Sequence, residues 1–172
     1  LAGIALLTRG TGNEPRNRGA SVQASSGSGG NVTAPREAPV EADIDSKEIL
    51  ATFNAGVAAF RQQDYTTAIG LFQEVIQEIP DNPHAQQYLG LCHFHRQEFP
   101  AAMSAFAEAR RHRPDSFEVL DNYVTAAKKA GDLEGASGAL RDFIQRNPDQ
   151  RGPRIELARI AREWGRPDEA VE

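Results

Sequence analysis

Small and bulky apolar residues recur along residues 83–116 at the spacing of two amphipathic helices. Leu89 and Gly90 lie together on the predicted inner face of the first helix. Ala102 and Phe106 are four residues apart, which places them on one face of the second helix. The segment therefore predicts a helix pair in which the small residues allow close approach and Phe106 fills the space between neighbours.

The same pattern returns at a fixed interval along the chain. The prolines that close successive units, Pro80, Pro114 and Pro148, are 34 residues apart, since 114 − 80 = 34 and 148 − 114 = 34. Small residues of the second helix, the bulky residues after them and a glycine of the first helix keep this interval. These sets are Ala68, Ala102, Ala136 and Ala170; Phe72, Phe106 and Leu140; and Gly56 and Gly90. A helical repeat array follows from this register.

The helical segments can be placed from their periodicity and turn residues. Helices are expected at 46–62, 65–78, 83–96, 99–112, 116–130, 133–146 and 151–164. Asp45 and Glu48 have the spacing of a cap on the first helix. Gly131 and Gly165 fall between helices, where turns are expected, and no strand pattern competes.

A period of 34 residues with two helices per unit resembles the tetratricopeptide repeat. The resemblance covers residues 49–172, within a predicted domain of residues 45–172. Its units are 49–82, 83–116, 117–150 and a fourth, truncated unit at 151–172. Thr52, Gln86, Leu120 and Arg154 stand where the family often has a tryptophan. Because the fourth unit stops early in its second helix, we expect Leu157, Ala158 and Ala161 to be poorly covered.

The resemblance implies an all-α fold, a right-handed solenoid of antiparallel helix pairs, here preceded by a disordered N-terminal tail. The composition agrees with a soluble domain, since 40% of the 172 residues are hydrophobic. The net charge of −5 offers no concentrated basic surface, so nucleic acid is not an expected partner. A lone cysteine, Cys92, excludes a disulfide-stapled scaffold.

The apolar run Leu1–Leu7 is far shorter than the roughly 20 residues of a membrane-spanning helix. It is either the end of a longer membrane anchor or an incidental apolar start. The localisation is therefore left between a cytoplasmic protein and a membrane-anchored one, which includes an anchor at the periplasmic face. The sequence makes no prediction of the oligomeric state.

Residues 8–44 are rich in Gly, Ser, Asn, Pro and Arg and contain few large apolar residues. Such a stretch buries too little surface to offset its ordering entropy, so we expect a flexible linker. The tripeptide Asn31-Val32-Thr33 fits a glycosylation acceptor, and a chance match in a biased tail is the alternative.

The chain offers few reactive constellations. Cys92 and His95 are three residues apart, but two candidate ligands fall short of the four that a zinc site usually has. No glycine-rich phosphate loop, nucleophile elbow or paired carboxylates of a catalytic site are found. We therefore expect no metal, no cofactor and no enzymatic activity.

If the chain is a member of the tetratricopeptide repeat family, the first helices of the units line a concave groove. The residues predicted to face it are Phe53, Val57, Phe60, His84, Gln87, Leu91, Phe94, His95, Lys128 and Lys129. The groove is apolar at its N-terminal end and charged toward its C-terminal end. Alternatively, Leu50 and Phe53 pack against the entering chain or cap the solenoid.

The predicted function is that of a scaffold that binds an apolar peptide or helix of a partner protein in this groove. Lys128 and Lys129 are expected to steer acidic residues of the partner. The carboxylate clamp known in the family is not expected, because Tyr88 and Glu118 stand at two of its positions. The alternative is a docking or regulatory module of a larger enzyme whose catalytic domain lies beyond Glu172.

Overall fold

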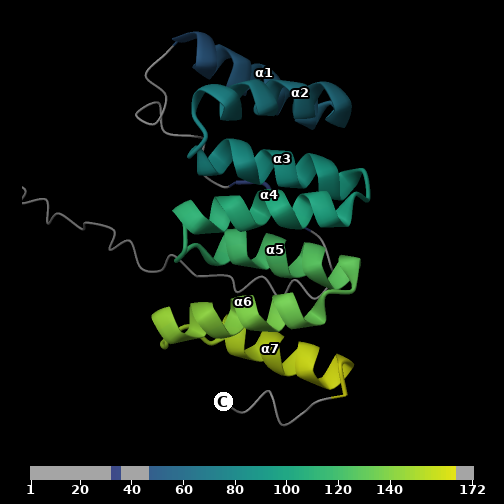
Figure 1. Ribbon diagram of the computed structural model, residues 1–172, viewed down its shortest axis with the longest axis vertical. Helices are drawn as coiled ribbons and strands as arrows, with labels where there is room; N and C mark the ends of the chain where they lie inside the picture. The colour runs from purple at the N-terminus through teal and green to yellow at the C-terminus, as the bar shows by residue number, and fades with distance from the viewer. Residues whose placement is uncertain (1–31, 36–46, 166–172) are drawn as a thin grey trace, which may run out of the picture.

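The computed structural model describes residues 32–35 and 47–165 (Figure 1). Within these ranges it contains seven α-helices and no strand. They are α1 (Lys47–Arg61), α2 (Tyr65–Glu78), α3 (Pro83–His95), α4 (Phe99–His112), α5 (Phe117–Ala130), α6 (Leu133–Arg146) and α7 (Gly152–Glu163). Every bound lies within one residue of the prediction, which confirms the helices. The predicted cap at Asp45, the apolar stub and most of the predicted tail lie outside the described residues.

Short polar side chains define where several of these helices begin. Asn82 accepts a hydrogen bond from the backbone N–H of Ala85 at 2.9 Å and so starts α3. Asp132 does the same for α6 through the N–H of Gly135 at 2.8 Å. Gly131 ends α5 with a φ of +82°, a left-handed conformation that glycine adopts without steric cost. Local chemistry therefore sets these boundaries.

Figure 1 shows the helices stacked in chain order along the long axis, each against the next. The pairs α1 with α2, α3 with α4, and α5 with α6 run antiparallel, and α7 begins a further unit. The arrangement is an all-α solenoid of helix pairs, as expected.

The predicted contact between a small and a bulky residue is confirmed in two units. A Cβ atom added to Gly56 would lie 2.8 Å from the ring of Phe72, and one added to Gly90 would lie 2.6 Å from the ring of Phe106. Both rings have 0% exposure, and Leu140, at the equivalent position of the third unit, has 1%. The repeated sequence pattern is therefore the pattern of helix packing.

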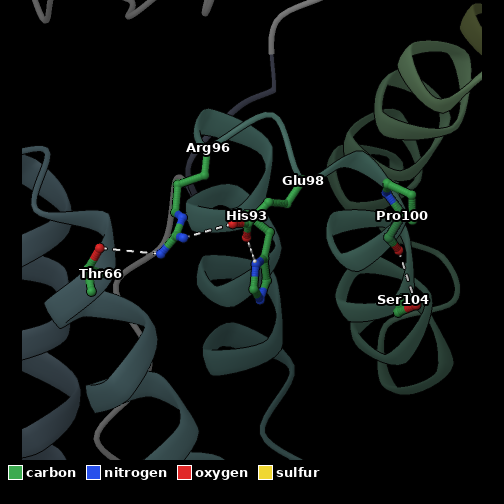
Figure 2. A network of polar contacts seen from close by, with 6 residues as sticks. All are labelled: Thr66, His93, Arg96, Glu98, Pro100 and Ser104. Atoms are coloured by element: carbon green, nitrogen blue, oxygen red, sulfur yellow. Dashed lines mark hydrogen bonds and ion pairs between the residues drawn. The ribbon is translucent and has the colours of Figure 1, made fainter.

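The turn between α3 and α4 is held by polar side chains (Figure 2). Glu98 receives a hydrogen bond from Nδ1 of His93 at 2.6 Å and an ion pair from Arg96 at 2.8 Å. Arg96 also donates to the hydroxyl of Thr66 in α2 at 3.3 Å. The hydrogen bond from His93 lowers the pKa of Glu98 below its ordinary value. This cluster fixes the α3–α4 pair against the preceding α2.

The expectation of poor cover at α7 is wrong for Leu157 and Ala161, which have 4% and 2% exposure. Leu157 packs in an apolar cluster with Leu140 and Phe143 of α6. The inner stripe of α7 is therefore buried, whereas Ala158 is half-buried. Among residues 32–35 and 47–165, no helix is long and apolar enough to cross a membrane.

Candidate functional site

Four residues of the predicted linker, Val-Thr-Ala-Pro at 32–35, lie against α5 and are called the docked segment. The backbone N–H of Thr33 donates to Oδ1 of Asn122 at 2.7 Å. Nδ2 of Asn122 donates in turn to the carbonyl oxygen of Thr33 at 2.8 Å. One side-chain amide therefore pairs with both backbone groups of a single residue, in the manner of a strand partner.

Val32 anchors the docked segment in an apolar pocket. Its exposure is 6%, and it belongs to the same buried cluster as Leu91 and Phe94 of α3 and Ala126 of α5. The side chains of residues 33 and 34 are exposed, so only the valine and the backbone are engaged. The docked segment is therefore held by the backbone of Thr33 and the side chain of Val32.

The contact of residues 32–35 with α5 differs from the prediction that residues 8–44 form a flexible linker. The composition of that stretch is indeed poor in large apolar residues. A single valine is held here because burial in the apolar cluster and the hydrogen bonds to Asn122 together offset the ordering cost.

A polar bridge joins α3 to α5 on the same surface. Nε2 of Gln87 donates to Oε1 of Glu118 at 2.7 Å, and Gln87 is fully buried. Glu118 lies one helical turn before Asn122, so the bridge and the asparagine share one face of α5. Because a carboxylate only accepts hydrogen bonds, Glu118 faces the Nε2 donor of Gln87. Oε1 of Gln87 points away from Glu118 and accepts no hydrogen bond from the described residues.

Charged residues at the C-terminal end of this face neutralise one another. Nζ of Lys128 lies 2.9 Å from Oε1 of Glu156 and 3.6 Å from Oε2 of Glu163, both in α7. Burial raises the pKa of the Asp121 carboxyl above its ordinary value, and the nearby Glu156 adds to this shift. Lys128 is therefore already paired within the chain, and the steering of acidic partners by Lys128 and Lys129 stays a prediction.

The predicted solvent-facing stripe is wrong for its largest side chains. Phe53 has 0% exposure, Leu91 has 1% and Phe94 has 9%. The ring of Phe53 packs edge-on against Phe72 and Tyr88, with centroids 5.5 and 5.8 Å away. In a tight stack, this face of a first helix also meets the neighbouring first helix, so the stripe contributes to the core.

The other predicted groove residues divide between the core and the surface. Gln87 and His84 are buried, at 0% and 5% exposure, and Phe60 and Val57 are half-buried against the same apolar cluster. Phe60 lies between aromatic rings of α2 and α3.

His95 and Lys129 are exposed. The ring of His95 stacks on Tyr65 with centroids 5.0 Å apart, and its partial burial lowers the pKa of His95. Of the ten predicted residues, Phe53, Leu91 and Phe94 belong to the same apolar cluster as Val32. Gln87 is joined to Glu118 of α5 by a hydrogen bond.

Sequence reasoning missed the two residues at the centre of this surface, Val32 and Asn122. One signal pointed to Asn122, since it occupies the repeat position of Tyr88 and Asn54: 54 + 34 = 88 and 88 + 34 = 122. Asparagine is a weak helix former because its amide competes for backbone groups. An asparagine in mid-helix at a groove position therefore indicates a polar role there.

The candidate metal ligands do not form a site. No group of three or more His, Cys, Asp or Glu side chains within the described residues is placed to hold a metal. Cys92 is fully buried, and burial raises the pKa of its thiol to about 12. The thiol is therefore protonated at neutral pH and a poor nucleophile.

A surface cleft lies elsewhere, between the second helices α4 and α6. It is lined by Arg110, Arg111, Pro114, Asp142, Gln145 and Arg146. Arg110 lies over the ring of Tyr123 at 5.1 Å from its centroid, so part of its guanidinium serves packing. The cleft is made from other helices than the surface around Asn122.

Comparisons with known proteins agree with this fold. Residues 59–121 match the sequence model of the tetratricopeptide repeat family. The first repeat domain of Spaghetti (RPAP3), solved bound to the HSP90 peptide SRMEEVD, superposes with a TM-score of 0.58 at 20% identity, over 71% of this chain and 99% of that one. The first repeat domain of human RPAP3 gives 0.56 at 19% identity, over 70% and 94%. No curated protein matches the sequence significantly.

A second group of similar structures is MamA. MamA of AMB-1 superposes with a TM-score of 0.61 at 17% identity, over 76% of this chain and 73% of that one. Helix pairs that repeat around one small-to-aromatic contact define a helical-repeat protein. Residues 59–121 therefore carry the tetratricopeptide repeat, and the described helices have the fold of these repeat structures.

Proposed function

We propose that the repeats bind an extended peptide segment of a partner protein on the face of α3 and α5, centred on Asn122, and act by binding rather than by catalysis. The observation that carries this proposal is the pairing of the Asn122 amide with both the N–H and the carbonyl of Thr33. In an α-helix these groups are engaged within the helix, so the amide fits an extended segment and not a helical one.

The chemistry of the surface specifies the peptide further. Val32 is buried in the apolar cluster, so an apolar residue is expected at this position of the peptide. The nearest charges on α5 are the carboxylates of Glu118 and Asp121, and the raised pKa of Asp121 reflects a site that already disfavours negative charge. A neutral or basic segment around the apolar anchor is therefore favoured over an acidic one.

A peptide selection tests the proposal. Random peptides are displayed and selected on a full chain whose docked segment is disabled by Val32→Asp and Thr33→Pro, which remove the apolar anchor and the donated N–H. We expect peptides with an apolar β-branched residue, whose affinity falls about tenfold or more when Asn122→Ala is added, since two hydrogen bonds are lost.

Asn54→Ala is the matched control, because Asn54 holds the same repeat position in α1 and is exposed. Circular dichroism checks that each variant is folded. Selected peptides that bind the Asn122→Ala chain as tightly as the Asn54→Ala chain contradict the proposed site.

A further inference from the structure

We propose that the docked segment is a tethered competitor, so that the chain covers its own peptide site until a partner displaces residues 32–35. This inference rests on the proposed peptide-binding function and adds its regulation. The docked segment uses both elements that the site offers, the Asn122 amide and the pocket of Val32. A partner that needs either element cannot bind while the segment is in place.

Because it is tethered to the repeats, the docked segment can compete with a partner peptide even if its own affinity for the site is low. Eleven residues, 36–46, join the docked segment to α1, since 46 − 36 + 1 = 11. A short connection of this kind gives an effective local concentration on the order of millimolar. A segment with an intrinsic dissociation constant of about 0.1 mM then weakens a competing peptide about tenfold.

The first test concerns occupancy in the intact chain. The exchange rate of the Thr33 amide is measured by NMR in the full protein at low concentration. We expect the amide to be protected, and its exchange to rise several-fold in Asn122→Ala but not in Asn54→Ala. Thr33 exchange at the rate of an unstructured amide, or equal in the two variants, overturns the proposal.

The second test uses a labelled synthetic peptide with the sequence of residues 28–38. We expect it to bind the full chain that carries Val32→Asp and Thr33→Pro, and to bind the unaltered chain on the order of tenfold more weakly. Adding Asn122→Ala to the first chain should abolish binding.

The outcomes separate the two proposals. Equal affinity for the altered and unaltered chains, or no binding to the altered chain, overturns the tethered competitor. If selected peptides still depend on Asn122 in that case, the proposed peptide site stands without the regulation. If the docked segment came from a second copy of the chain, the protection of the Thr33 amide would fall when the protein is diluted. That result would also overturn the proposal.

Discussion

Asn122 pairs with both backbone groups of Thr33 through a single side chain. A buried amide within a helix is unfavourable unless both its donor and its acceptor are paired. Here both ends pair with Thr33, a residue 89 positions away. The equivalent positions of the first two units carry an exposed asparagine and a tyrosine packed among aromatic rings. The same repeat position is therefore exposed in the first unit, packed in the second, and paired with the docked segment in the third.

Glycine substitutions test the packing at the residue scale. In Gly90→Ala the added methyl would overlap the ring of Phe106, which is itself fully buried and cannot move freely. We expect the free energy of unfolding to fall by about 1–3 kcal/mol in chemical denaturation, the usual cost of overpacking.

Gly70→Ala is the matched control, because Gly70 lies within α2 and a Cβ there meets nothing within 4 Å. Alanine favours a helix over glycine, so this variant should gain about 0.5–1 kcal/mol. Equal effects of the two substitutions would mean that Gly90 is not a close-contact position.

At the scale of elements, α3 is the centre of the stack. Nine of its 13 residues are buried, and they lie on every side of the helix. α1, at one end, buries only Phe53 and Gly56. The difference arises because α3 is packed by α2, by α4 and by side chains of α1 and the docked segment. A continuous buried surface leaves α3 without the single polar face that an amphipathic helix shows.

The connection between α5 and α7 gives a prediction at this scale. Lys128→Met keeps the apolar stem but removes the charge that pairs with Glu156 and Glu163. We expect the free energy of unfolding to fall by about 1 kcal/mol at low salt and by less at 1 M salt, because salt screens half-exposed pairs.

Hydrogen exchange should rise mainly within α7 in this variant. Lys129→Met is the control, since Lys129 is exposed on the same turn of α5. An equal loss of stability in the control would show that net charge, and not the bridge to α7, is responsible.

At the scale of the whole molecule, the core consists of two apolar clusters along the stack. One extends from α1 to α5 and the other from α5 to α7, and both contact Met103 and Tyr123. In repeat proteins each unit is stabilised chiefly by its neighbours. Disturbance of one cluster should therefore spread most to adjacent helices.

Phe106→Ala tests this arrangement. Phe106 is fully buried in the first cluster, and its loss should cost about 3–5 kcal/mol in chemical denaturation. Hydrogen exchange should rise most in α3 and α4 and least in α7. Ile155→Ala is the control, since Ile155 is 61% exposed. A thermal melt that shifts no more than in this control would refute the repeat register.

The sequence by itself determined the helices and the contacts within each pair. A period of 34 residues reports positions that every unit needs, such as Gly90 against Phe106, because these contacts are local and recur. Caps such as Asn82 and the turn at Gly131 are also local, and so the bounds of the helices were predictable.

Only the tertiary structure decided which side of each first helix is covered. Periodicity identifies an apolar stripe but not what lies on it, so Phe53 and Leu91 were assigned to solvent although neighbouring helices bury them. The pairing of Thr33 with Asn122 joins segments 89 residues apart and uses backbone groups that every residue has. Composition carries no trace of such a contact, because the pocket and the amide that make it favourable exist only after the helices have packed.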